Sequence, residues 1–96
     1  MLRAMISDTA FEQKWVLQGR LCGQWAEELM QQWESTRNSR RGRRCVVDLE
    51  DVTCVDRKGE AVLLEMVTEG AVFAASRAYM KHVLETINER TPTMNR

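Results

Sequence analysis

The sequence predicts a single small α/β domain, with a mixed β-sheet and about three helices in the order β-β-α-β-α-β-α. Apolar residues alternate along the first twenty residues and then recur every three or four residues between Cys22 and Trp33. Residues 45–67 change from a β-branched apolar run to a helical one at Asp56. Strands that alternate with helices favour right-handed crossovers and a sheet covered on at least one face. A chain of 96 residues can build one core but not two.

The first twenty residues are predicted to form a β-hairpin. Residues 1–6 are mostly apolar, and residues 7–9 (Ser-Asp-Thr) supply turn chemistry. The second strand would place four residues on its buried face: Trp15, Leu17, Gly19 and Leu21.

From Cys22 the apolar period predicts an amphipathic helix that begins near Gly23. Its apolar stripe contains Cys22, Trp25, Ala26, Leu29, Met30 and Trp33. A stripe rich in Met and Trp could form a groove for a partner. Because stripes at helical spacing are far more often core, we expect core here.

The second half of the chain is predicted to contain two strand–helix pairs. Asp56 is expected to cap the first of these helices, because its carboxylate can accept hydrogen bonds from the free N–H groups of the first turn. Gly70 would end that helix. A buried strand over residues 71–75 and a last helix capped by Ser76 would follow, with a flexible tail over residues 91–96 and the domain itself spanning residues 1–90.

Composition limits the classes of function. Lys+Arg and Asp+Glu balance at 14 each, so no overall field attracts the chain to nucleic acid or membrane. Cys22, Cys45 and Cys54 form no CxxC pair and lie among apolar residues, which predicts buried thiols in a reducing compartment. Neither a signal peptide nor a membrane-length apolar run is visible, so we expect a cytoplasmic protein without direct membrane insertion.

The sequence favours a protein that is not an enzyme. Its single histidine, His82, is predicted to face solvent, and the cysteine spacings match no common zinc motif. No phosphate-binding GxxxxGK[ST] or nucleophile GxSxG motif is present. Asp48 within the apolar strand is expected to have a local hydrogen-bond partner. We therefore predict no catalytic residue, metal or cofactor.

One dense charge cluster lies in residues 37–44. Such a cluster could contact phosphates, but it has no aromatic residue for base stacking and its flanks are acidic. We expect a solvated connection rather than a nucleic-acid site. The cluster consists of Arg37, Arg40, Arg41, Arg43 and Arg44.

Residues 46–59 and the order of elements resemble the STAS domain. This is the fold of bacterial anti-sigma-factor antagonists, which regulate transcription, and of cytoplasmic modules of transporters and sensors. Family members have an apolar strand with an Asp, an acidic or small turn, a Val-Thr-Phe-Ile-like run and Asp-Ser-Ser/Ala-Gly at the helix start. Asp56 and Gly59 match the outer positions of that motif, and residues 17–21 resemble the second strand.

The departures from the family motif lie between these two positions. In phospho-regulated members a serine follows the Asp, whereas here Arg57 and Lys58 follow and neither can accept that phosphate. Glu60 stands where the family often has Leu. The resemblance therefore implies a protein-binding surface without phosphorylation site or serine switch, centred on Asp56, Arg57, Lys58, Gly59 and Glu60, with Gly23 and Trp25 adjacent.

The implied partner is an anti-sigma-factor kinase, a sensor complex or a transporter subunit with an acidic surface. Arg57 and Lys58 oppose the helix dipole by about 0.3–1 kcal/mol each, so they either are solvated or hold an acidic partner or an anion. Two other classes stay open. One is anion or nucleic-acid binding through residues 37–44, and the other is a homodimer formed by edge-to-edge pairing of the first strand.

Overall fold

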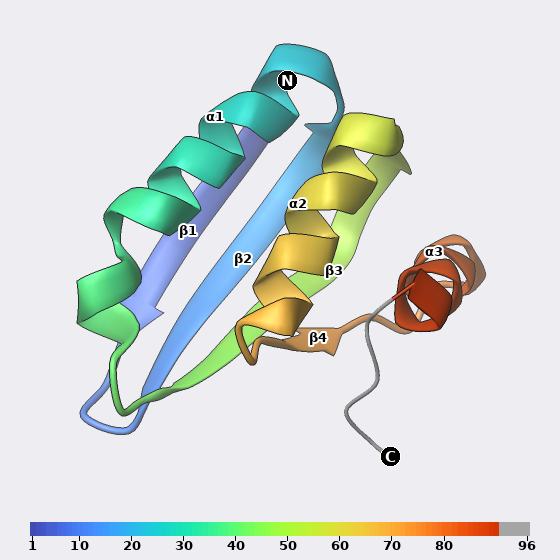
Figure 1. Ribbon diagram of the computed structural model, residues 1–96. Helices are drawn as coiled ribbons and strands as arrows, with labels where there is room; N and C mark the ends of the chain where they lie inside the picture. The colour runs from blue at the N-terminus through green and yellow to red at the C-terminus, as the bar shows by residue number, and fades with distance from the viewer. Residues whose placement is uncertain (91–96) are drawn as a thin grey trace.

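The computed structural model describes residues 1–90, in which the chain forms a four-stranded mixed sheet and three α-helices (Figure 1). The predicted fold class and order of elements are confirmed, while the predicted tail at residues 91–96 lies outside the described residues. The strands are β1 (Leu2–Asp8), β2 (Glu12–Leu21), β3 (Arg44–Val55) and β4 (Val72–Ala74). The helices are α1 (Gly23–Ser35), α2 (Arg57–Thr68) and α3 (Ala78–Arg90), and a short 3₁₀ helix, η1 (Arg37–Arg40), precedes β3.

The sheet has the order β1-β2-β3-β4, with β1 antiparallel to β2 and the other two pairs parallel. The predicted hairpin is therefore present, and α1 and α2 are the crossover helices of two βαβ units. The register between β2 and β3 shifts twice, at Val16/Gln18 and at Gly19/Arg20, and each shift adds one residue to β3. The first bulge lies between Asp48 and Asp51 of β3, so Leu49 and Val52 both face the core although they are three residues apart.

The helices bury their apolar stripes in one core. In Figure 1, α1 and α2 lie side by side over one face of the sheet, and α3 lies beyond β4. Trp15 of β2 and Trp33 of α1 pack at the centre, with ring centroids 5.5 Å apart and planes tilted by 60°. On the opposite face of the sheet, none of the described residues is buried, and Met5 and Val72 are 44% and 46% exposed.

The residues after α2 differ from the predictions in detail. β4 has three residues and Val72 is exposed, so it is a short edge strand rather than a buried strand over residues 71–75. The predicted capping role of Ser76 is wrong, because its hydroxyl donates to Glu50 Oε1 at 2.7 Å and α3 begins two residues later. Tyr79 fixes the start of α3, since its hydroxyl accepts a hydrogen bond from Val55 N at 2.9 Å.

Burial of the three cysteines is uneven. Cys45 is 7% exposed and confirms the prediction of a buried thiol. Cys22 and Cys54 are half-buried, so the prediction is wrong for them. Both lie where the two central strands end, Cys22 directly after β2 and Cys54 as the second-last residue of β3. None of the helices in residues 1–90 has the length and apolarity that crossing a membrane requires.

Candidate functional site

Asp56 joins β3 to α2 and is bonded to both crossover helices. Its Oδ1 accepts a hydrogen bond from Gly59 N at 2.9 Å, which confirms the predicted N-cap of α2. Its Oδ2 accepts from Gly23 N, also at 2.9 Å, at the start of α1. The N–H groups of Gly59 and then Gly23 lower the pKa of the Asp56 carboxyl, because both bonds favour its charged form. Asp56 therefore has a structural role that ties two helix starts together.

Gly59 is buried against the end of β2. A Cβ atom at this position would lie 2.2 Å from Leu21 O and 2.8 Å from Val55 Cγ1. The missing side chain therefore lets α2 pack closely on the sheet. The contact surface expected at residues 56–60 is interrupted here, because Gly59 lies inside the fold.

Two of the charges expected to contact a partner already form ion pairs. Lys58 Nζ bonds to Glu27 Oε2 on α1, and this bond raises the pKa of Lys58. Glu60 Oε1 lies 3.2 Å from Arg90 Nη1 on α3. Arg57 differs, because it is exposed and its guanidinium makes no hydrogen bond or ion pair with any of residues 1–90.

A groove of about 410 Å³ lies between α1 and α2, and we call it the α1–α2 groove. Lys58 and Glu27 sit on its two sides, so their ion pair is part of its wall. Arg57 directly precedes Lys58 at the start of α2. The other lining residues are Ala26, Met30 and Gln31 of α1 and Ala61 and Val62 of α2.

Trp25 does not contribute to this groove. It lines a separate hollow of about 100 Å³ on the β1 side of α1, together with Leu2 and Ala4. The structure therefore brings Lys58 to the groove but places Trp25 on the other flank of the helix. Sequence reasoning missed Met30 and Ala61: Met30 belongs to the stripe assigned to the core, and Ala61 stands out by neither charge nor period.

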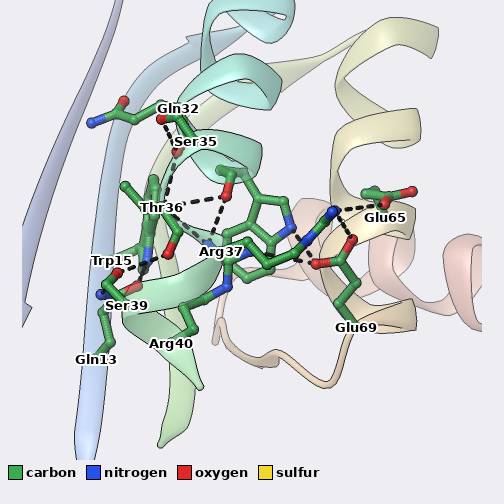
Figure 2. Close-up of polar contacts among 11 residues, drawn as sticks. Gln13, Trp15, Gln32, Ser35, Thr36, Arg37, Ser39, Arg40, Glu65 and Glu69 are labelled. Atoms are coloured by element: carbon green, nitrogen blue, oxygen red, sulfur yellow. Dashed lines mark hydrogen bonds and ion pairs between the residues drawn. The ribbon is translucent and has the colours of Figure 1, made fainter.

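Two arginines of the cluster, Arg37 and Arg40, bond to other parts of the fold, as Figure 2 shows. Arg40 is 9% exposed, and its guanidinium lies 3.4 Å from the centroid of the Trp33 ring. Its Nη1 donates to Trp33 O at 2.7 Å and to Thr36 Oγ1 at 3.0 Å, and its Nη2 donates to Glu69 Oε1 at 3.4 Å. Burial lowers the pKa of Arg40, and the nearby Glu69 opposes that shift.

Arg37 and Arg43 are also held by the fold. Arg37 bonds to Glu69 Oε2 at 2.8 Å, and Arg43 pairs with Asp8 Oδ1 at 2.8 Å. The prediction of a solvated connection is therefore wrong for Arg40 and Arg43, because Glu69 at the end of α2 and Asp8 at the end of β1 supply acceptors that are distant in sequence. Arg37 remains exposed although it pairs with Glu69. Arg41 and Arg44 are exposed, with no side-chain hydrogen bond or ion pair to the described residues.

The remaining candidate residues have local roles or stay exposed. Asp48 Oδ1 accepts a hydrogen bond from Glu50 N at 2.9 Å, the local partner that was expected. His82 is exposed on α3. Within residues 1–90, no three side chains of His, Cys, Asp or Glu come together as a metal site.

Comparisons with known proteins add no relative. A scan against protein-family models finds no match to this chain, and a search of curated proteins finds none either. What the fold and the site define is a small mixed α/β domain with a groove between its two crossover helices. The resemblance to the STAS domain stays a prediction that rests on the Asp56–Gly59 motif and the order of elements.

Proposed function

We propose that this protein is a non-enzymatic protein-interaction module that binds an acidic segment of a partner in the α1–α2 groove. The observation that carries the proposal is Arg57, an exposed cation without an ion pair among residues 1–90, at the start of the helix that forms one wall of the groove. Ala26, Met30, Ala61 and Val62 supply apolar lining beside it. Such a site suits a segment with an apolar residue next to a carboxylate.

The unfavourable position of Arg57 supports an acidic partner. A cation in the first turn of a helix opposes the dipole by about 0.3–1 kcal/mol, and Asp56 offsets part of this. A partner carboxylate could form a bidentate bond with the Arg57 guanidinium and offset the rest. Lys58 contributes less, because Glu27 already neutralises it.

The resemblance to the STAS domain suggests the kind of partner. It favours an anti-sigma-factor kinase or, as the alternative, a sensor or transporter subunit that uses this chain as its cytoplasmic module. Because Arg57 occupies the position of the family's serine, the interaction would lack a serine phospho-switch. Nucleic-acid binding is the weaker candidate, since three of the five clustered arginines are bonded within the fold.

The test is capture of partners from native cell extract with the full chain, followed by titration of the identified partner. Arg57→Glu is expected to weaken binding at least tenfold, and higher salt should weaken the wild type. Arg41→Glu is the matched control, because it makes the same change at an exposed arginine on another part of the surface. If Arg57→Glu and Lys58→Glu both leave every captured partner bound, the proposed surface is wrong.

The nucleic-acid alternative has its own test. DNA or RNA is titrated at two salt concentrations against the wild type and a variant in which Arg41 and Arg44, the two exposed arginines of the cluster, are replaced by Ala. Salt-sensitive binding that this variant loses would favour the alternative over the groove.

A further inference from the structure

Cys22 and Cys54 lie together near Asp56, the residue that joins β3 to α2. Cys22 immediately precedes α1, and Cys54 is the second-last residue of β3, two residues before Asp56. Their Sγ atoms are 3.2 Å apart, with the Cys22 thiol donating to Cys54 Sγ. A disulfide bond of about 2.05 Å is reached from this distance by a closure of roughly 1 Å. Both residues are half-buried, so a small oxidant can reach them.

The third cysteine is separate from this pair. Cys45 lies near the opposite end of β3, nine positions before Cys54 in the sequence, which corresponds to roughly 30 Å along a strand. It is buried, and burial raises the pKa of its thiol. Cys45 is therefore an internal control for the oxidation experiments, because its thiol is buried and lies far from Cys22 and Cys54.

We propose that Cys22 and Cys54 form a reversible disulfide under a hydroperoxide oxidant, and that this bond regulates partner binding at the neighbouring α1–α2 groove. The regulatory half rests on the proposed function, whereas the disulfide itself does not. The disulfide would regulate partner binding near Asp56, where Arg57 stands in place of the serine that is phosphorylated in the resembled family.

The chemistry balances with hydrogen peroxide as the oxidant. One thiolate attacks a peroxide oxygen, which forms an S–O bond and breaks the O–O bond, and the hydroxide that leaves takes up a proton as water. The second sulfur then attacks the sulfenic sulfur, the S–S bond forms, the S–O bond breaks and a second water leaves. Two thiols are oxidised and one peroxide is reduced to two waters. A dithiol reductant reverses the result by thiol–disulfide exchange.

The bond would act on both crossover helices. It joins the residue before α1 to a residue just before the α2 cap, so it constrains the Gly23–Asp56 hydrogen bond and the angle between the groove walls. It also closes a loop of about thirty residues in the unfolded chain, which is expected to raise Tm by roughly 15–30 °C. The hydrogen bond to Cys54, followed by burial, raises the pKa of Cys22, so oxidation should accelerate as pH rises.

The test treats the reduced full chain with hydrogen peroxide and follows intact mass, free thiols and Tm. We expect the loss of two hydrogen atoms, a peptide linked through Cys22 and Cys54, reversal by dithiothreitol and the rise in Tm. Cys45→Ser should behave like the wild type, and Cys22→Ser should lose all of these changes. Linkage through Cys45, covalent dimers, or separate sulfinic acids in place of the disulfide would overturn the proposal.

A second arm separates the disulfide from the binding function. Reduced and oxidised Cys45→Ser protein are compared as bait for the identified partner, and oxidation is expected to lower capture at least threefold. Equal capture by both forms would overturn the regulatory half. If the reduced bait binds no partner, the proposed function has failed, while the mass and Tm changes still decide the disulfide.

Discussion

Replacing Asp56 by Asn tests whether one carboxylate stabilises both helix starts. An Asn oxygen can still accept the hydrogen bond from Gly59 N, because Asn is as good an N-cap as Asp. Its amide NH₂ would then face the N–H of Gly23, which loses its acceptor. A hydrogen bond to a charged group contributes about 1.5–3 kcal/mol. Since Gly23 is half-buried and water can replace part of it, we expect Asp56→Asn to cost about 1.5 kcal/mol.

Asp56→Ala removes the cap as well and should cost about 1 kcal/mol more, or about 2.5 kcal/mol in all. For a domain of this size these losses correspond to Tm decreases of roughly 6–12 °C for Asn and 10–20 °C for Ala. Urea unfolding followed by tryptophan fluorescence measures them, because Trp15 and Trp33 are buried in the native core. The midpoint should fall while the m-value stays constant.

The pH dependence gives a second measurement of the same bonds. The folded protein holds the pKa of Asp56 below its ordinary value of 3.8, so its stabilisation is full well above that value. It is lost as pH falls through 3.8 towards the lowered pKa, because the unfolded chain binds the proton first. The stability difference between wild type and Asp56→Asn should therefore shrink below about pH 4. Equal stability at pH 7, or a difference that persists undiminished to pH 2, would refute the stabilisation by the two hydrogen bonds to the Asp56 carboxylate.

Three further substitutions test other contacts. Gly59→Ala should cost about 1–3 kcal/mol in urea unfolding, because its Cβ meets the end of β2. Gly70→Ala, in open space at φ 101°, should cost about 1 kcal/mol from backbone strain alone. A larger loss for Gly70→Ala than for Gly59→Ala would contradict the close packing of Gly59. Arg40→Ala should cost about 2–3 kcal/mol in thermal unfolding because buried acceptors lose their donor, against less than about 0.5 kcal/mol for Arg41→Ala. Tyr79→Phe should cost about 1 kcal/mol and speed amide exchange at the last residue of β3, and an unchanged exchange rate would count against that bond.

The parts of the fold that the sequence predicts are those whose causes are local. The alternation around Trp15 and the helical stripe around Leu29 each state a period within a dozen residues, and the structure buries both. Asp56 caps a helix through a residue three positions away, a distance that a motif can encode. Order and type of the elements follow from such signals.

The features that the sequence does not predict depend on partners distant in the chain. The bond between Gly23 and Asp56 spans 33 positions. Arg40 is buried because Trp33 and Glu69 converge on it from two helices, and composition alone indicates solvation for such a residue. The observed candidate site differs from the predicted one for the same reason. Lys58 is paired with Glu27 of α1, and the groove depends on how α1 and α2 pack.

α1 depends on α2 at both ends, which has a consequence for how the domain folds. At its start Cys22 supplies no side-chain cap and Asp56 serves instead. At its end Trp33 Nε1 donates to Glu69 Oε1 at 3.2 Å. An isolated helix of this length is marginal in water, so α1 should form stably only once α2 has docked. The two helices are then one cooperative unit, and their amides should exchange hydrogen with a common free energy of opening.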